Sequence, residues 1–270
     1  MRSAIWEQGA TLTYAGRWAE GRRGWLMRFL EEELRKRPPE PSSDTRRRAK
    51  PDPWLISFLD KTNYERGLVN TAISRQERDR MGLNVVFASH LTKQERRRLN
   101  RWQLSALEHF RRRLAVTDAS VARFVVAGAV EGYYGRFPGI PEEIMLSLAQ
   151  GKPVYIVGAL GGAAADVGAL LGLAHPRMGD VPPSLKAEPI RFEESLQEIA
   201  DRLRPGPWTN LPVTAADLAR FFKKHALGGR NWPNNGLTSD ENRKLFASKD
   251  ADEVAEFVVK GLMRIHQAIA

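Results

Sequence analysis

Two glycine-interrupted loops in the middle of the sequence carry the residue types that bind anions. The first lies in AGAVEGYYGRFPGIPEE at residues 127–143, and the second lies in GKPVYIVGALGGAAADV at residues 151–167. Each loop follows a pattern typical of a buried strand and precedes a predicted helix, so backbone N–H groups and the positive end of a helix dipole would face a bound anion. We therefore expect phosphate groups to bind at the carboxyl ends of two adjacent strands.

Charged residues beside the first loop could add chemistry to this site. Glu142 and Glu143 fall in the first turn of the helix predicted over 141–150, with Pro141 at its first position. With Arg136 they are the candidate catalytic residues of an enzyme, since a carboxylate there could bind ribose hydroxyls or help to cleave an N-glycosidic bond. Other interpretations stay open: the carboxylates stabilise the helix dipole, and Arg136 is either a phosphate clamp or an ordinary solvated arginine.

The glycines also have a purely structural explanation, because they allow tight turns and close packing of helix on sheet. One loop alone does not decide between the two explanations, whereas two in consecutive units favour a ligand site. The five histidines are scattered without the spacing of metal ligands, so neither a metal nor a required cofactor is expected. The predicted ligand-binding residues are Gly16, Arg17, Gly128, Gly132, Arg136, Pro138, Gly139, Glu143, Gly158, Gly161 and Gly162.

The elements that position these loops alternate between strand and helix. Strands are predicted over 122–130 and 153–160, and helices over 141–150 and 163–173. This alternation is typical of a parallel sheet covered by helices, and we expect an α/β fold, a Rossmann-like three-layer sandwich with a mostly parallel sheet. Shorter strand patterns lie at 11–16, where the strand ends on glycine, and at 54–59 and 84–88.

Residues 1–270 are expected to form a single α/β domain with an exposed, proline-rich loop over 38–53. Residues 183–270 are expected to form a helical C-terminal extension packed on the sheet domain. Its predicted helices cover 192–203, 214–226, 239–246 and 250–269, and the last three begin at N-caps Thr214, Ser239 and Asp250.

The basic charge of the chain could indicate that the protein binds nucleic acid. Lys and Arg number 42 against 32 Asp and Glu, which gives a net charge of +10. Much of this charge lies in the helix predicted over 92–114, which carries Arg111, Arg112 and Arg113 and is capped by Thr92. A solvated helix face is the favoured interpretation, and a single-stranded nucleic-acid-binding protein is the alternative. The lack of cysteine excludes a disulfide framework and a thiol nucleophile. The longest apolar run, residues 153–173, is interrupted by Asp166 and five glycines, so no membrane span is predicted and a cytoplasmic protein is expected.

Together the two loops resemble the SLOG superfamily, Rossmann-like proteins related to the LOG cytokinin-activating enzymes and to the DNA-processing protein of natural transformation. The chain is most similar to a bacterial branch found in defence and stress systems, often beside TIR-type effectors. GATLTYAG at residues 9–16 is similar to the early strand and glycine loop of that branch. NGLTSDENRKLFASKDADEVAEFVVKGL at residues 235–262 is similar to its closing segment.

The resemblance implies that a nucleotide, or a molecule derived from NAD or ADP-ribose, binds at the strand ends and is sensed, with a TIR-type or other effector as partner. It leaves the oligomeric state open, a homo-oligomer included. LOG enzymes remove a base from nucleoside monophosphates with an Arg and a Glu near PGG-x-GT-x-x-E. Here the matching stretch is the shorter PGIPEE at 138–143, so which glutamate corresponds is undecided, and an N-glycosidase (phosphoribohydrolase) is the alternative to a sensor.

Members of the superfamily usually begin with a strand and a Gly/Ser loop that precede the helix ending here near Gly9. We therefore expect either an in-frame strand upstream of Met1 or a reduced member of the superfamily that lacks its first strand.

Overall fold

The structure is a computed structural model that describes residues 12–14, 55–60, 83–89, 97, 99–133, 135, 137–174, 211–212 and 214–269. The chain divides into two compact units, Arg2–His90 and Leu91–Ala270. No helix in the described ranges combines the length and apolar character that crossing a membrane requires. The loop expected over 38–53 and the helix expected over 192–203 lie outside the described residues.

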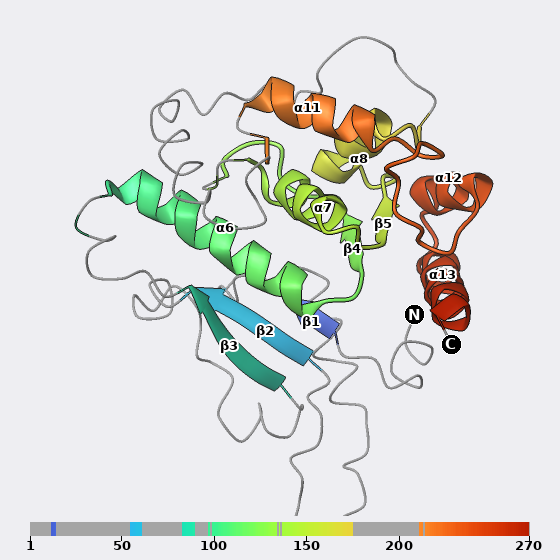
Figure 1. The fold of residues 1–270 in the computed structure, drawn as a ribbon, viewed down its shortest axis with the longest axis horizontal. Coiled ribbons are helices and arrows are strands. Elements are labelled where there is room, and N and C mark those ends of the chain that lie inside the picture. Colours follow the sequence, from blue (N-terminus) through green and yellow to red (C-terminus); the bar gives the residue numbers. More distant parts are fainter. Residues whose placement is uncertain are drawn as a thin grey trace, which may run out of the picture. The chain divides into compact units, whose positions relative to one another are not determined.

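The Arg2–His90 unit contains a three-stranded parallel sheet in the order β1-β2-β3 (Figure 1). β1 spans Leu12–Tyr14, β2 spans Leu55–Asp60 and β3 spans Leu83–Ser89. Leu55 in the central strand pairs with Leu12 on one side and with Leu83 on the other. The three predicted strands are confirmed. The second and third agree with their expected ends within one residue, whereas β1 ends at Tyr14, two residues before the predicted end at Gly16.

The Leu91–Ala270 unit contains the two strands next to the glycine loops. β4, Arg123–Val126, and β5, Val154–Val157, are parallel and pair from Arg123↔Val154 to Val126↔Val157. Each is followed by a helix, α7 over Gly139–Ala149 and α8 over Gly162–Leu170. The predicted alternation of strand and helix is therefore confirmed, as is the mixed α/β class with parallel strands.

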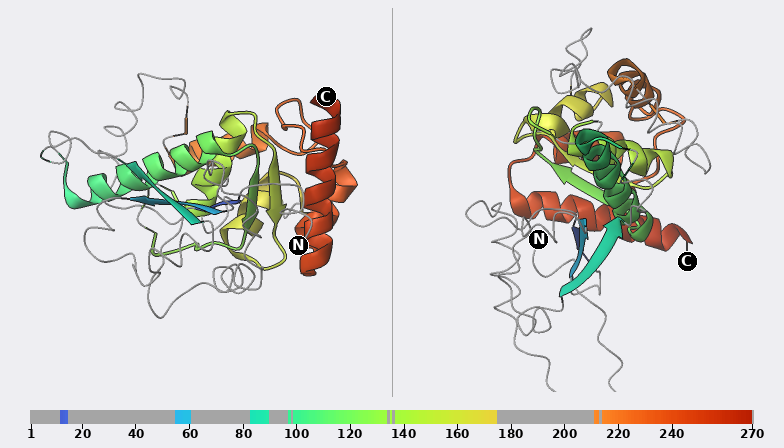
Figure 2. Two further views of the ribbon diagram at one scale, coloured as in Figure 1. Left: turned by 90° about the horizontal axis from the view of Figure 1, so that it is seen from below. Right: turned by 90° about the vertical axis from the view of Figure 1, so that its left-hand side faces the viewer.

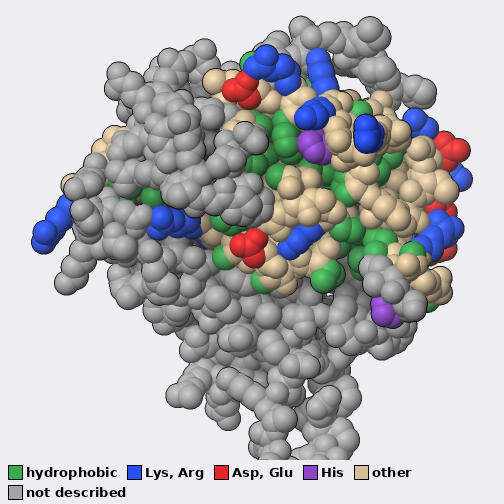
Figure 3. Space-filling view, in the orientation of Figure 1, with side chains coloured by type: hydrophobic (Ala, Val, Ile, Leu, Met, Phe, Trp, Pro, Cys, Tyr) green, Lys and Arg blue, Asp and Glu red, His purple; other side chains and the backbone are tan. Residues whose placement is uncertain are grey.

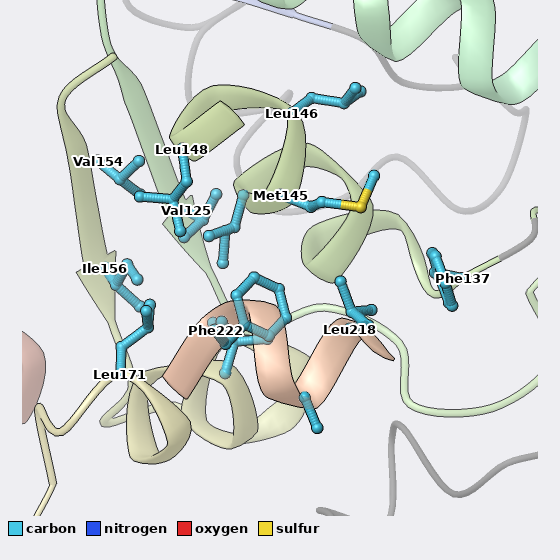
Figure 4. Packing of buried hydrophobic residues seen from close by; sticks show 14 of the residues in the cluster. Val125, Phe137, Met145, Leu146, Leu148, Val154, Ile156, Leu171, Leu218 and Phe222 are labelled. Carbon is cyan, nitrogen blue, oxygen red and sulfur yellow. The ribbon is translucent and has the colours of Figure 1, made fainter. Parts of the chain in front are cut away.

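Helices cover both faces of the β4–β5 sheet. On one face, Val125, Val154 and Ile156 join a core cluster with α7, α8, α6 (Arg101–Ala119) and α11 (Ala215–Lys224). Figure 4 shows the members from the two strands, α7 and α11. On the other face, Tyr155 and Val157 pack against α12 (Ser239–Ala247) and α13 (Ala251–Ile269), and Figure 2 shows α13 alongside the strands. Apolar residues alternate between the two faces because successive strand side chains point to opposite sides.

The outer edge of β5 is covered by the segment that contains α12. Nδ2 of Asn235 donates to the carbonyl of Val154 at 3.0 Å, and the amide of Gly158 donates to the carbonyl of Phe246 at 2.9 Å. The hydroxyl of Tyr155 donates to the carbonyl of Asn235 at 2.8 Å, and burial raises the pKa of this tyrosine. The backbone polar groups of Val154 and Gly158, along the outer edge of β5 and just after it, thus form hydrogen bonds with segment 235–246.

Two of the three predicted N-caps are confirmed and one is wrong. Thr214 forms a capping box with Asp217, and Oδ1 of Asp250 accepts from two amides of the first turn of α13. α12, however, is capped by Thr238 with Glu241, not by Ser239. A Thr–Glu pair three residues apart can exchange two hydrogen bonds, which the Ser239 pairing does not offer.

Glu241 also joins α12 to α13. Its carboxylate accepts from Nζ of Lys260 and Nη1 of Arg264, each at 2.7 Å, and from the amide of Thr238 at 2.8 Å. The hydrogen bond from Lys260, then those from Thr238 and Arg264, lower the pKa of Glu241 to about 2. The N-terminus of α12 and the third and fourth turns of α13 are held together through this one carboxylate.

Helices α7 and α6 differ from their predicted bounds. α7 begins at Gly139, so Pro141 is its third residue and not its first. Proline is tolerated at either place because amides of the first turn have no intrahelical partner. α6 ends at Ala119, five residues beyond the predicted end, and Asn100 exchanges hydrogen bonds with Gln103 at its start. The predicted cap Thr92 lies outside the described residues.

Candidate functional site

The first glycine loop, residues 127–139, leaves β4 through two residues with left-handed backbone. Ala127 has φ 53° and Gly128 has φ 99°. Among the described non-glycine residues only Ala127 has a positive φ, a conformation that costs an L-residue about 1–2 kcal/mol. A Cβ on Gly128 would lie 2.4 Å from Cγ1 of Ile140, so glycine is what lets α7 begin this close to the end of the strand.

The N-terminus of α7 presents amides that no described residue uses. Pro138 is the N-cap and makes no side-chain hydrogen bond to the helix. The amides of Gly139 and Ile140 have no hydrogen-bond partner within the described ranges, Pro141 has no N–H, and the amide of Glu142 bonds to the carbonyl of Pro138 at 3.2 Å. Two adjacent unused donors at the positive end of a helix dipole are suited to an anion.

The guanidinium of Arg113 lies beside this loop. A Cβ on Gly135 would be 2.7 Å from Nη1, and a Cβ on Gly139 would be 3.1 Å from Nη2, so the two glycines leave space for the group. Nη1 donates to Oε2 of Glu142, whose side chain is fully buried, and Nε lies 3.9 Å from Oε1 of Glu143. The expectation that Arg112 and Arg113 belong to a solvated helix face is wrong, because each is only 6% exposed.

A second arginine, Arg123 at the start of β4, extends the ion-pair network. Its Nη1 lies 3.5 Å from Oε2 of Glu143, its Nη2 donates to Oγ1 of Thr117 at 2.8 Å, and its Nε donates to Oγ of Ser147 at 3.4 Å. The hydroxyl of Thr117 in turn donates to the carbonyl of Arg113 at 2.8 Å. Helices α6 and α7 and strand β4 are therefore joined by polar contacts as well as by the core.

This geometry assigns the two glutamates different environments. Glu142 has no exposed surface, and its Oε1 makes no hydrogen bond within the described residues while Oε2 is held by Arg113. Glu143 retains 18% side-chain exposure and faces Arg113 and Arg123. A buried carboxylate needs its charge balanced, and the arginines supply that balance. Neither glutamate is a freely solvated group of the first helical turn.

The second glycine loop, residues 158–162, packs directly against the first. The amides of Ala163 and Ala164, in the first turn of α8, donate to the carbonyls of Gly128 and Ala127 at 3.1 and 2.8 Å. A Cβ on Gly162 would lie 2.5 Å from the carbonyl oxygen of Gly128. Two amides of the α8 N-terminus are thus bonded within the chain, and the loops form one assembly at the carboxyl ends of β4 and β5.

The ring of Phe246 fills a slot between Gly158 and Gly168. A Cβ on Gly158 would be 2.2 Å from the ring, and a Cβ on Gly168 would be 2.1 Å from it. Gly158 follows β5 and Gly168 lies in α8, so the end of α12 is wedged against the second glycine loop and its helix. Both glycines are required by packing. For Gly158 this is the structural explanation considered from the sequence, whereas no role was predicted for Gly168.

Of the remaining predicted site residues, two lie in the glycine loops and three lie outside the described residues. Gly132 lies exposed in the first loop with φ 66°, and Gly161, the N-cap of α8, has φ 72°. Gly16, Arg17 and Arg136 lie outside the described residues. The first loop therefore brings together Gly128, Pro138, Gly139 and Glu143, and the second brings Gly158, Gly161 and Gly162 to the same edge of the sheet.

Three residues of this site, Arg113, Arg123 and Phe246, were not predicted from the sequence. A signal for Arg113 does exist, because it lies seven residues after Ala106 and three after Phe110, on the apolar face of its helix. Arg123 likewise interrupts a run that otherwise reads as a buried strand. For Phe246 the sequence offers no such local signal.

The two loops and helices α6, α7, α8 and α11 lie within a region that matches a protein-family model. The model, described as SLOG cluster2, matches residues 56–245, more than half of the chain. Comparison with curated proteins and with solved structures found no match. The resemblance to the SLOG superfamily is thereby confirmed, and the chain belongs to the SLOG cluster2 family.

Proposed function

We propose that this protein binds a nucleotide, or a ligand derived from NAD or ADP-ribose, with a phosphate of the ligand at the N-terminus of α7. The observation that carries the proposal is the pair of adjacent amides, Gly139 and Ile140, that no described residue uses. They lie at the end of a buried parallel strand, where α/β folds bind ligands. Membership of a SLOG family supports a nucleotide-related function.

The surroundings of these amides support an anionic ligand further. The helix dipole places about half a positive charge at the N-terminus of α7. The carboxylates of Glu142 and Glu143, which would oppose a phosphate, are balanced by Arg113 and Arg123. The arginines therefore keep the first turn of α7 compatible with a negative ligand.

We also infer that the whole fold is a Rossmann-like sandwich. Two successive strand–helix units, β4–α7 and β5–α8, with parallel strands and helices on both faces, support this inference. A role as a sensor in bacterial defence or stress signalling, with a TIR-type effector partner, follows from the resemblance alone. It predicts that an effector encoded beside this protein binds it differently with and without ligand, which a pull-down in both states would test.

The alternative function is an N-glycosidase, and Oε1 of Glu142 is the observation in its favour. That atom makes no hydrogen bond within the described residues, and it could accept one from a ribose hydroxyl only if the first turn of α7 opened to expose it. Sensing remains the better-supported function, because Glu142 is fully buried and its other oxygen is held by Arg113. Release of free base or nicotinamide that is lost in both Glu142→Gln and Glu143→Gln variants would establish the enzyme instead.

Calorimetry with nucleoside monophosphates, ADP-ribose, cyclic ADP-ribose and NAD tests the binding proposal. Ile140→Pro removes one of the two donors at a helix position that tolerates proline, whereas Ile140→Val keeps the donor and loses one methylene. A hydrogen bond to a charged group contributes about 1.5–3 kcal/mol, so the proline variant should bind the ligand at least about tenfold more weakly than the valine control. Folded protein that binds none of these ligands, or equal affinity of the two variants, would contradict the proposal.

A further inference from the structure

Helix α11 carries a row of basic residues on its outer face. Leu218, Ala219 and Phe222 bury its inner face in the core cluster. Arg220, Lys223 and Lys224 are exposed, and their spacing of i, i+3 and i+4 places them on one side of the helix. The space-filling view in Figure 3 shows basic side chains gathered over α11.

A fourth cation follows in a turn whose backbone is held in place. Arg230 is exposed in the segment 226–232. The amide of Gly229 donates to the carbonyl of Ala226 at 3.0 Å, and the amide of Trp232 donates to the carbonyl of Gly229 at 3.1 Å. Nδ2 of Asn231 donates to the carbonyl of Lys224 at 3.1 Å, which ties this turn to the end of α11.

Three of these four cations form no ion pair with any described carboxylate. Arg220 pairs with Asp217, the one acidic residue between 211 and 235. Lys223, Lys224 and Arg230 have no such partner within the described part of the chain. The dipole of α11 accounts for lysines in its last turn, at about 0.3–1 kcal/mol each, but it does not account for Arg230.

The aromatic side chains near these cations, Phe221 and Trp232, are half-buried and not fully exposed. Phe221 stacks on His225 with ring centroids 4.1 Å apart, and Phe221 and Trp232 pack against the core cluster. Stacking of unpaired bases requires exposed aromatic faces. A nucleic acid on this surface would therefore be held through its phosphates.

We propose that α11 and the following turn form a surface, defined by Lys223, Lys224 and Arg230, that binds the phosphodiester backbone of double-stranded nucleic acid without reading its sequence. Each of these three cations lacks an ion-pair partner among the described residues and can contact one phosphate, the group that a duplex repeats along both strands. The surface is distinct from the buried α6 arginines, and it does not depend on the nucleotide site.

Salt dependence of binding to a labelled duplex, measured by fluorescence anisotropy between about 50 and about 200 mM salt, tests this proposal. Three phosphate contacts predict a slope of log K against log salt of about −3, and Lys223→Gln with Lys224→Gln should reduce its magnitude by about 2. The matched control is Lys244→Gln with Lys249→Gln, which removes the same charge from exposed lysines at and after the end of α12. The control should retain the wild-type slope.

Three results would overturn the proposal. The first is equal weakening by both pairs of substitutions, which would mean that only net charge matters. The second is absence of duplex binding at the lowest salt. The third is binding of a single strand about tenfold tighter than the duplex, or equally tight binding of polyglutamate, since either would identify a different partner.

Discussion

Substitution of Gly168 by alanine tests the packing of Phe246 against α8. Gly168 is helical, and in an isolated helix alanine would be more stable than glycine by about 1 kcal/mol. In this structure the new Cβ would lie 2.1 Å from the Phe246 ring, and the ring is confined further because it also packs so closely on Gly158 that a Cβ there would lie 2.2 Å from it. The substitution must therefore displace the ring or the end of α12.

The expected magnitudes follow from these two opposing effects. Overpacking of a core destabilises a protein by about 1–3 kcal/mol. At the upper end of that range, less the roughly 1 kcal/mol that alanine gains over glycine in a helix, Gly168→Ala lowers the free energy of unfolding by about 2 kcal/mol. In a Phe246→Ala background the obstacle is gone, and the same substitution should stabilise the protein by about 1 kcal/mol. The coupling between the two sites is then about 3 kcal/mol.

Urea unfolding followed by far-UV circular dichroism gives the free energy of unfolding of the four proteins in this double-mutant cycle: the wild type, the two single variants and the double variant. Phe246 is partly buried, so Phe246→Ala should cost less than the roughly 3–5 kcal/mol of a fully buried phenylalanine and leave a folded reference. Equal effects of Gly168→Ala in the two backgrounds, within about 0.5 kcal/mol, would refute the placement of the ring.

Three further predictions concern polar contacts. Arg113→Met should lower the free energy of unfolding, measured in urea, by about 3–5 kcal/mol because it leaves the buried carboxylate of Glu142 without its ion-pair partner. Adding Glu142→Leu should restore most of that loss. Thr238→Ala should lower the free energy of unfolding by about 1 kcal/mol because Thr238 is the N-cap of α12, and Ser239→Ala should lower it much less. Thermal unfolding of the two variants distinguishes these outcomes. The pKa of Glu241 is about 2 when folded, below its unfolded value, so its stabilising effect is complete above about pH 4.5 and is lost as the pH falls towards 2. In a Glu241→Gln variant the free energy of unfolding should therefore depend less on pH between about 4.5 and about 2. The same pH dependence in the variant and the wild type would contradict the lowered pKa of Glu241.

Local patterns were sufficient to predict the described strands and helices, because the signals that define them lie within a few residues. They overestimated the strands predicted over 122–130 and 153–160, which span only Arg123–Val126 and Val154–Val157. Thr214 and Asp217 exchange their capping bonds three residues apart, and Gly161 opens α8 as its position after an apolar strand predicts. At α12 two overlapping Ser/Thr patterns compete, and the choice of Thr238 depends on Glu241, whose other partners come from α13.

The site could be predicted only in outline, because its decisive contacts join distant parts of the chain. Arg113 and Glu142 are 29 residues apart, and no local pattern indicates that they form one buried pair. The Phe246 ring meets Gly158 and Gly168 across a still longer separation. The sequence located the glycine loops at the correct edge of the sheet, but the partners that neutralise the glutamates and fill the slot depend on tertiary packing.

The covered edge of β5 has a consequence for self-association. Exposed strand edges are templates on which another chain can add a strand, and such pairing is a common origin of fibrils and of exchanged dimers. In this protein the Val154 carbonyl and the Gly158 amide are already bonded to Asn235 and Phe246. An incoming strand must first detach segment 235–246, so the resistance of this sheet to polymerisation on that side is set by how firmly α12 is held.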